Sequence, residues 1–437
     1  MKANLLKRIA KYKKEIKDIG DDIYENPELG FEEYRTKKKI KEFLEDLNLE
    51  VEESIAITGL TVTIGDGSKG PTIAVLADMD ALYYPEHPEA NNKGAVHACG
   101  HNAQIAALLT TLIALNDKKI LDKLQGSIKF ILTPAEEFMN LEHREKLKEQ
   151  GEISFLSGKK EMIKEGVFDD VDIVLASHSS LNEKNHIGIG GTNNGFLSKE
   201  YNFKGKASHA GGAPHLGRNA LDSANISLNA INAWRQTFLE EDYIRVHPIL
   251  TEGGTTVNVI PSIAQIETYI RAFDIEAIKK TASKIDAACK GGAMALGCNL
   301  IIDNKGGYLP FHSEGLINKT LKNNAEELEA IKTFDNGHFT GSSDLGDISM
   351  LKPCGIISMG GISGNPHTIN FSYSNTDEAY ILPGKVFALT IIDLLKNKAD
   401  KADKVINSFK PKLTKEEYLK LTEELNSKEK HEYYNDI

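Results

Sequence analysis

The strongest constraint on the fold is a series of short, largely apolar runs spread along the 437-residue chain. They are PTIAVLA at 71–77, SIKFIL at 127–132, DIVLAS at 172–177 and GIISM at 355–359. Segments of helical character alternate with them, at 103–115, 158–165 and 383–396. Uninterrupted apolar strands are typical of a sheet that is buried on both faces. The pattern therefore predicts an α/β domain with a mostly parallel sheet flanked by helices.

The middle of the chain, residues 193–305, follows a different pattern. It reads as a half-exposed strand at 196–207, an amphipathic helix at about 217–238, three alternating strands at 244–254, 255–262 and 264–274, a helix at 275–290 and a short strand at 298–303. This βαββαβ-like order predicts a small ferredoxin-like α+β sandwich inserted into the larger domain. The larger domain is then expected to comprise 1–192 and 306–437. Near its end, Thr414 followed by Glu417 predicts a capping box at the start of a peripheral helix.

Composition excludes several classes of function. The net charge is −11, whereas nucleic acids and anionic membranes reward a basic surface. The N-terminal residues are charged and lack an apolar core, so we expect no signal peptide, and no apolar run is long enough for a membrane span. Only four widely spaced cysteines occur, which does not suggest a disulfide framework. We therefore expect a cytoplasmic protein with reduced thiols.

Reactive side chains follow each of the buried runs. They are Asp78 and Asp80 after the first, Glu136 and Glu137 after the second, His178 after the third and His367 after the fourth. Ligands in open α/β sheets bind at the carboxyl ends of the strands, so these side chains are expected at one edge. The motif HACGH also places Cys99 and His101 at the start of a helix. Thiol, imidazole and carboxylate donors together suit zinc, manganese or a similar divalent ion.

Each of these residues also has an ordinary explanation when taken alone. A single His178 is more often a surface residue, a pair such as Glu136 and Glu137 is usually solvated, and Cys99 could be a small buried hydrophobe. Two other functions stay open. One is a thiol hydrolase with Cys99 as nucleophile and His101 as base, which leaves the carboxylates and the other histidines without roles. The other is a non-catalytic, metal-dependent binding protein.

Seven motifs, in order along the chain, resemble those of a known family. They are PELGFEE, LADMDAL, HACGHN, PAEE, HAGGAPHLGRNALD, GGTTVNVIP and SSDLGD. The chain resembles the aminoacylase/carboxypeptidase-type dinuclear metallopeptidases over about residues 15–400, and within them the amidohydrolase branch that includes aminobenzoyl-glutamate hydrolases. The resemblance implies a zinc-peptidase-like catalytic domain and an enzyme that hydrolyses an amide bond. The expected substrate is an N-acyl amino acid, an aminobenzoyl-glutamate-like conjugate or a short peptide with a free carboxylate.

The resemblance also implies roles for individual residues. Two divalent ions per subunit, zinc or manganese with cobalt or nickel as alternatives, would be held by Cys99, His101, Glu137, His178 and His367. Cys99 would bridge the two ions. Glu136 matches the general base, which accepts the proton of the attacking water, and Asp80 matches the carboxylate that orients a ligand.

The inserted domain carries the remaining implied roles. His209 resembles the histidine that reaches a neighbouring subunit's site and polarises the scissile carbonyl. Asn258 and Arg271 resemble residues that bind the substrate's carbonyl and carboxylate, and a homodimer is expected to form through this domain. The chain departs from the pattern at 138–160, where a charged insertion is expected to reshape the substrate cleft.

Overall fold

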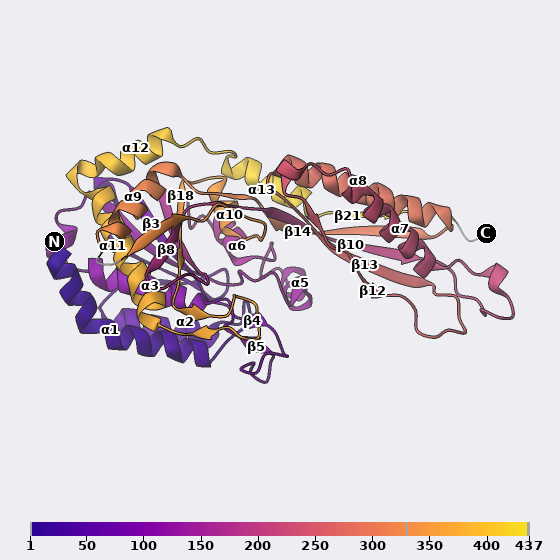
Figure 1. Cartoon of the computed structure of the whole chain (residues 1–437), viewed down its shortest axis with the longest axis horizontal. Coiled ribbons are helices and arrows are strands. Elements are labelled where there is room, and N and C mark those ends of the chain that lie inside the picture. Colours follow the sequence, from indigo (N-terminus) through magenta and orange to yellow (C-terminus); the bar gives the residue numbers. More distant parts are fainter. Residues whose placement is uncertain (1, 329–330, 435–437) are drawn as a thin grey trace. The chain divides into compact units, whose positions relative to one another are not determined.

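The computed structural model describes residues 2–328 and 331–434 (Figure 1). The chain divides into two compact units. The first comprises Met1–Thr192, His312–His338 and Asp347–Lys412, and the second comprises Asn193–Phe311, Phe339–Gly346 and Leu413–Ile437. Among the described residues, no helix has both the length and the apolarity needed to cross a bilayer.

The first unit is built on an eight-stranded sheet with the order β1-β2-β6-β3-β7-β18-β8-β16. The strands are β1 Val51–Ile55, β2 Gly59–Asp66, β3 Thr72–Asp78, β6 Gly126–Thr133, β7 Ile173–Ser179, β8 His186–Ile189, β16 Lys332–Asp335 and β18 Cys354–Met359. The four central strands, β6, β3, β7 and β18, run parallel, while β2 and β8 are antiparallel to their central neighbours. The carboxyl ends of the four central strands therefore meet at one edge of the sheet, as the apolar runs predict.

Helix α3, His101–Leu115, is buried along its whole length. It packs on β3 and β7 and is covered by α1, Lys2–Glu25, and α11, Leu382–Leu395. Each apolar side chain buried in this core contributes roughly 1.5–3 kcal/mol, so the start of α3 is fixed firmly beside the sheet edge. The other helices of this part of the chain are α2 Tyr34–Asp46, α4 Lys118–Leu121, α5 Leu141–Glu149, α6 Gly158–Glu165, α9 Gly315–Glu326, α10 Leu345–Ser349 and α12 Asp400–Ser408.

Short elements complete the connections. Two-residue strands are β4 Leu82–Tyr83, β5 Ala95–Val96, β9 Thr192–Asn193, β15 Phe311–His312, β17 His338–Phe339, β19 Ile362–Ser363 and β20 Ser372–Tyr373. Single helical turns are Gly67–Lys69, Pro214–Leu216, Glu240–Asp242, Asp377–Ile381 and Asn397–Ala399.

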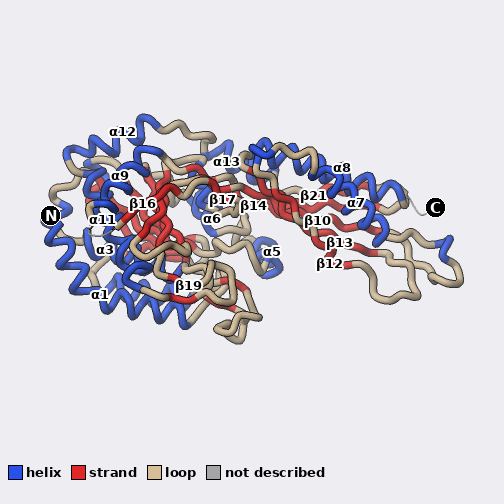
Figure 2. The backbone as a smooth tube through the Cα atoms, viewed as in Figure 1, coloured by secondary structure: helices blue, strands red, loops and turns tan. Residues whose placement is uncertain are grey.

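The second unit is an α+β layer pair. Its antiparallel sheet has the order β11-β13-β10-β14-β21, with β12 also pairing with β13. The strands are β10 Gly195–Lys204, β11 Arg245–Val246, β12 Ile249–Glu252, β13 Ile263–Ala272, β14 Asn299–Tyr308 and β21 Lys428–His431. Helices α7, Ala220–Arg235, and α8, Ile275–Ala295, lie together against one face of this sheet (Figure 2).

One expected strand is absent from the described residues: the alternating segment 255–262 is a loop with a single bridge. Its apolar side chains have no sheet face to cover, since Val257 is 99% exposed and Val259 is 40% exposed. Its backbone bonds a neighbouring loop instead. The Ala210 N–H donates to the Asn258 carbonyl and the Ile260 N–H donates to the Ser208 carbonyl. Alternation of apolar and polar side chains is therefore not sufficient to predict a strand in this segment.

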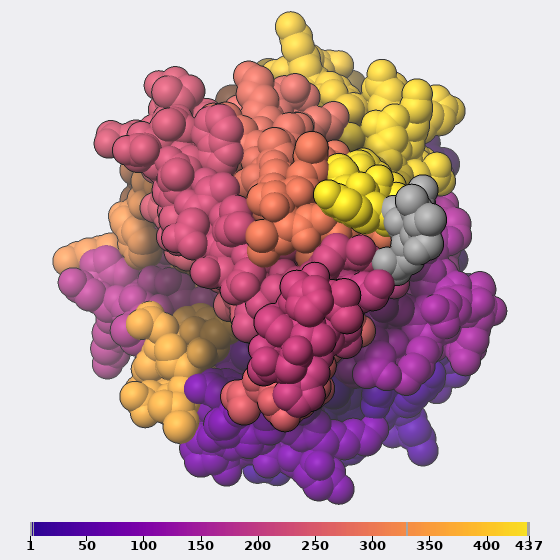
Figure 3. Space-filling view, turned by 90° about the vertical axis from the view of Figure 1, so that its right-hand side faces the viewer, coloured from indigo at the N-terminus to yellow at the C-terminus, as the bar shows by residue number. Residues whose placement is uncertain are grey.

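The residues after 412 belong to the second unit. Helix α13, Lys415–Glu424, begins with the predicted capping box, in which Thr414 and Glu417 bond each other's backbone N–H groups. Strand β21 then pairs antiparallel with β14, and the yellow C-terminal segment lies against orange atoms of this unit in Figure 3. The second unit's sheet is thereby extended by a strand that is distant in sequence.

Candidate metal centre

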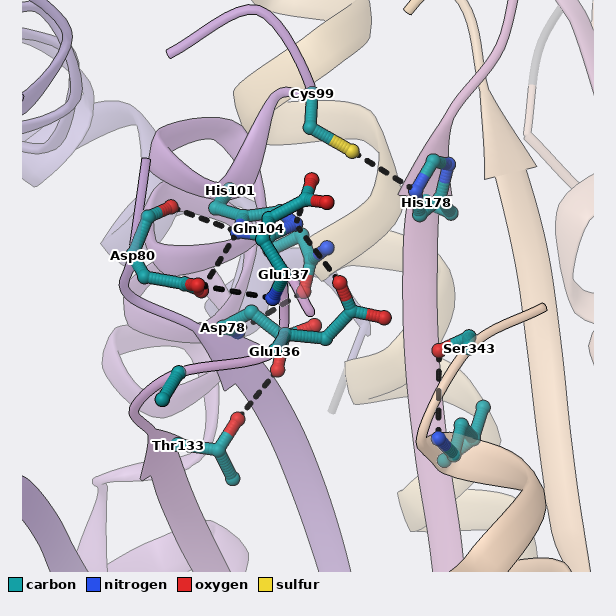
Figure 4. Close-up of polar contacts among 12 residues, drawn as sticks. Asp78, Asp80, Cys99, His101, Gln104, Thr133, Glu136, Glu137, His178 and Ser343 are labelled. Atoms are coloured by element: carbon teal, nitrogen blue, oxygen red, sulfur yellow. Dashed lines mark hydrogen bonds and ion pairs between the residues drawn. The ribbon is translucent and has the colours of Figure 1, made fainter. Parts of the chain in front are cut away.

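The carboxyl edge of the central strands gathers the residues that the sequence places there (Figure 4). Asp78 ends β3, the Glu136–Glu137 pair follows β6, and His178 lies near the end of β7. Cys99 and His101 lie at the start of α3, and His367 lies on the loop between β19 and β20, which follow β18. Six side chains, from Cys99, His101, Glu136, Glu137, His178 and His367, form three overlapping groups whose donor atoms lie within 4.8 Å of one another.

Cys99 is at the centre of these contacts. Its Sγ lies 3.4 Å from His178 Nε2 and 3.3 Å from His367 Nε2. His367 Nε2 is also 3.2 Å from Glu137 Oε1. His101 Nε2 lies 3.9 Å from a carboxylate oxygen of both Glu136 and Glu137. A single thiol therefore belongs to two donor groups, which share no other residue.

The imidazoles are oriented by bonds on their far sides. His101 Nδ1 lies 2.8 Å from the Asp80 carbonyl oxygen, and His178 Nδ1 lies 2.8 Å from the Ser179 carbonyl oxygen. A carbonyl oxygen can only accept, so both Nδ1 atoms donate and both Nε2 atoms turn toward Cys99 and the carboxylates. Within the described chain, His101 Nε2 is buried without a hydrogen-bond partner. A ligating histidine has this arrangement, and the donor set therefore fits a metal ion.

The electrostatics of the cluster favour the ionised ligands. Burial and Glu137 oppose ionisation of Cys99, but the surrounding histidines hold the pKa of its thiol well below the usual value. Burial likewise disfavours charge on His367, yet Cys99 and Glu137 raise its pKa to about 11. Burial also opposes ionisation of Glu137, but His367 and His101 lower the pKa of its carboxyl group. The negative thiolate and carboxylate are thus balanced by protonated histidines. A divalent cation would replace those protons, because an imidazole binds a metal in its neutral form.

The backbone of the HACGH turn requires its glycine. Gly100 has φ of 85°, a left-handed conformation that side chains other than glycine rarely adopt. A Cβ atom there would lie 2.1 Å from Ser179 Oγ. The His367 N–H also donates to the Ala98 carbonyl at 2.8 Å, which ties the His367 loop to the same turn. This backbone bond therefore helps to bring His367 to Cys99.

Some residues of the site region were not assigned roles from the sequence. The Asp78 carboxylate bonds Thr133 Oγ1 at 2.5 Å and pairs with the buried Lys159 ammonium, so Asp78 supports the sheet edge. Glu33 and Arg144 bond the backbone of the Glu136–Glu137 turn. The motif PELGFEE contains Glu33 and could have drawn attention to it, whereas nothing in the sequence near Arg144 indicates a buried arginine.

Three other predicted residues lie in the second unit. His209 is exposed, and its Nδ1 accepts from the Gly211 and Gly212 N–H groups at 3.2 and 2.8 Å. Asn258 lies on the loop that bonds Ala210. Arg271, on β13, donates to Ser342 Oγ at 2.6 Å.

The Arg271 guanidinium also lies over two aromatic rings, 5.1 Å from the Phe196 centroid and 5.4 Å from the Tyr269 centroid. Burial lowers its pKa. In the part of the chain that the structure describes, no carboxylate pairs with this guanidinium. Such a half-buried cation is suited to binding an anionic group.

A family model for peptidase family M20/M25/M40 matches residues 74–393. The chain belongs to this family. The predicted family resemblance is thus confirmed. Membership, together with hydrolase relatives, identifies an enzyme that hydrolyses amide or peptide bonds in a metal-dependent reaction.

Relatives of this M20/M25/M40 enzyme include two proteins of known reaction class. It is 34% identical to thermostable carboxypeptidase 2 of Saccharolobus solfataricus over 61% of this chain and 67% of that protein. It is 29% identical to one subunit of the p-aminobenzoyl-glutamate hydrolase of Escherichia coli over 63% of this chain and 55% of the relative. A dinuclear metal-binding M20 peptidase of Bacillus subtilis shares the fold, with a TM-score of 0.67 and 23% identity over 88% of this chain and 99% of that one. This likeness confirms the predicted fold class.

Proposed function

We propose that this M20/M25/M40 enzyme uses two divalent ions to hydrolyse an amide bond in a substrate with a free carboxylate. The substrate class is an N-acyl amino acid, an aminobenzoyl-glutamate-like conjugate or a short peptide. The observation that carries the proposal is the convergence of six donor side chains around Cys99, with the Nε2 atoms of the histidines directed toward them. The names of the carboxypeptidase and aminobenzoyl-glutamate hydrolase relatives support the substrate class.

The proposed ligands are Cys99, His101, Glu137, His178 and His367. Cys99 Sγ lies 3.4 Å from His178 Nε2 and 3.3 Å from His367 Nε2, and it is the one residue common to their two donor groups, which supports a bridging role between two ions. A mixed set of thiolate, imidazole and carboxylate favours zinc, with manganese, cobalt and nickel as alternatives. When bound, such ions act as Lewis acids that polarise a carbonyl and lower the pKa of water.

Glu136 is the proposed general base. It is the neighbour of a proposed ligand, and its carboxylate lies at the rim of the cluster, 3.9 Å from His101 Nε2. Glu136 accepts a proton from the attacking water as the new C–O bond forms at the amide carbon. It then delivers that proton to the amide nitrogen as the C–N bond breaks, which yields a carboxylic acid and an amine. Asp80 keeps the ligand His101 in one tautomer during this cycle.

Substrate recognition is assigned to the second unit. The half-buried Arg271 guanidinium would bind the substrate's carboxylate by two parallel hydrogen bonds. Asn258 would donate to the substrate's carbonyl. Aromatic contacts with Phe196 and Tyr269 restrict where the Arg271 side chain can point, which reduces the entropy lost on binding.

His209 is proposed to act in a neighbouring subunit of a homodimer. Because its Nδ1 accepts from two backbone N–H groups, a neutral His209 carries its proton on Nε2. That N–H group can donate to a carbonyl oxygen as negative charge develops there. The inserted segment 193–305 would form the dimer, with 1–192 and 306–437 as the proposed catalytic portion. Residues Leu413–Ile437 of that portion group with the second unit.

Metal content measured together with activity tests the proposal. The protein is purified without chelator, its metals per chain are determined by mass spectrometry, and it is assayed on N-acyl amino acids, dipeptides and aminobenzoyl-glutamate. We expect about two ions per chain and chelator-sensitive release of an amine. Activity without metal that is abolished by thiol alkylation would instead indicate a Cys99 nucleophile.

A further inference from the structure

We propose that Arg144 and Glu33 are positioning residues that clamp the backbone of residues 134–137 and so fix the directions of Glu136 and Glu137. This inference rests on the proposed function, because it concerns the base and the ligand assigned there. It also gives a role to the charged insertion at 138–160, which we expected to reshape the substrate cleft. The clamp acts through main-chain groups, and neither residue is expected to touch substrate.

The polar backbone groups of this turn are held from several directions. The Ala135 N–H donates to Glu33 Oε1 at 2.9 Å, and the Glu137 N–H donates to Asp80 Oδ2 at 2.9 Å. The Glu137 carbonyl accepts from Arg144 Nη2 at 2.5 Å. The Ala135 carbonyl accepts from the Gly158 N–H at 3.3 Å and from Arg144 Nη1 at 3.4 Å. Both sides of the Glu136 peptide are therefore anchored.

Arg144 is an unusual residue to find in this place. It comes from the short helix α5, is 2% exposed, and lies with its guanidinium 5.6 Å from the Phe31 ring centroid. Its polar partners among the described residues are backbone carbonyl oxygens, including that of Leu156 at 2.7 Å. Burying a guanidinium group costs free energy. Here the planar guanidinium of Arg144 links the Leu156 carbonyl, near the end of the insertion, to the Glu137 carbonyl just before it.

Glu33 reaches the turn from the segment between α1 and α2. It is fully buried, and its second oxygen accepts from Thr58 Oγ1 at 2.6 Å, so the carboxyl group is held rigidly. The segment before it packs as closely. A Cβ atom on Gly30 would lie 2.3 Å from Arg144 Nη2 and 2.9 Å from Ala135 Cα. The two anchors and the turn therefore form one tightly packed group.

The turn needs such support because its conformation is strained. Ala135 has φ of 51°, in the left-handed region that alanine rarely adopts. In this conformation the Glu137 carboxylate points toward His367, as a proposed metal ligand. The neighbouring Glu136 carboxylate serves as the proposed base for the attacking water. If the anchors are lost, the turn can relax, and both carboxylates move. A small displacement of a general base lowers the catalytic rate strongly, since about 1 Å can reduce it roughly 100-fold.

Two pairs of variants separate positioning from general stability. Arg144→Met removes the fork, while Arg144→Lys retains a donor for one carbonyl. Glu33→Met removes the acceptor for the Ala135 N–H, while Glu33→Gln retains it. Leu44→Ala, in a fully buried position of α2, serves as a control that destabilises the unit without touching the turn. For each variant we would measure kcat, KM, the thermal midpoint and the visible spectrum of the Co²⁺-substituted protein.

We expect Arg144→Met and Glu33→Met to lower kcat by about 100-fold with little change in KM, and to alter the Co²⁺ spectrum through Glu137. Arg144→Lys and Glu33→Gln should recover much of the wild-type kcat and much of the wild-type Co²⁺ spectrum. If the two Met variants behave like Leu44→Ala at an equal thermal midpoint, the clamp is wrong. Full activity of Glu136→Gln would refute the base assignment, yet the Co²⁺ spectra, which report on Glu137, would still decide for or against the clamp.

Discussion

The carbonyl oxygen of Asp80 accepts from His101 Nδ1 at 2.8 Å, and Asp80 Oδ1 lies 3.2 Å from the same nitrogen. The other carboxylate oxygen accepts from the Glu137 N–H at 2.9 Å. One residue just after β3 thus orients a histidine on α3 and a glutamate after β6. Partners of this kind fix the tautomer and the angle of a metal ligand.

Substitution of Asp80 should therefore weaken metal binding. We expect Asp80→Ala to lower metal affinity by about 10- to 100-fold, which is typical for loss of a group that orients ligands. The metal affinity of Asp80→Asn should lie between those of wild type and Asp80→Ala, because the introduced amide oxygen can still accept from the Glu137 N–H. Competition with a fluorescent chelator measures both affinities. Unchanged affinity in Asp80→Ala would show that the backbone carbonyl alone suffices to orient His101.

Glu136→Gln separates the base from the ligands. The amide cannot accept a proton, so kcat should fall by about 10²- to 10⁴-fold. Metal content should remain at the wild-type value, because the proposed ligands are intact. Glu137→Gln is the matched comparison, and it should lose metal as well as activity. Equal metal loss in both variants would mean that Glu136 is itself a ligand.

The sequence predicted the sheet edge well because its signals are local and redundant. Three of the apolar strands are followed at once by their reactive residues and the fourth is followed by His367 after a short loop, and parallel strands bring these residues to one edge of the sheet. His178 and His367 could be placed beside Cys99 on this basis before any distance was known. The fold class was predicted from the same apolar runs, whereas the family was predicted from its resemblance to seven ordered motifs.

Other features depend on contacts that no local pattern encodes. The apolar alternation at 255–262 indicates a strand, but the segment bonds the loop around Ser208 and stays outside the sheet. Asp78 shares the local context of Asp80, yet a lysine from the insertion pairs with it. Strand β21 adds to β14 from more than a hundred residues away. A buried arginine such as Arg144 is likewise defined by its partners rather than by its neighbours in sequence.

The Arg271 assignment predicts selectivity for a negatively charged group. Hydrogen bonds to charged groups contribute about 1.5–3 kcal/mol, so Arg271→Met should lower kcat/KM for a free-acid substrate by roughly 10- to 100-fold. The corresponding substrate methyl amide should be affected far less. Arg271→Lys keeps the charge but loses the planar fork and should be intermediate. An equal loss for the acid and the amide would assign Arg271 a structural role.

The placement of His209 in a neighbouring subunit can be tested by mixing inactive chains. We expect His209→Ala and Glu136→Gln each to be strongly impaired. If His209 acts across a dimer interface, subunit exchange creates mixed dimers in which one site is complete. Statistical mixing then restores about a quarter of the sites. No recovery after exchange, with the mixed dimers verified by mass spectrometry, would place His209 in its own chain's site.

Glu33 should make the stability of the enzyme fall as the pH rises. Burial, with a contribution from Asp80, raises the pKa of Glu33 to about 8, whereas a glutamate in the unfolded chain titrates near 4.3. Between these values the unfolded chain has lost the proton and the folded chain retains it, so raising the pH favours unfolding. Below about 4.3 and above about 8 this contribution is constant.

The variant Glu33→Gln isolates this effect, because it keeps the hydrogen bond to Ala135 and has no proton to lose. Its thermal midpoint, relative to wild type, should therefore increase between about pH 5 and pH 8 in matched chelator-treated samples. The surface variant Glu142→Gln, on α5, serves as the control and should show no such rise. A midpoint difference between Glu33→Gln and wild type that stays constant over this range would mean that Glu33 ionises normally in the folded chain.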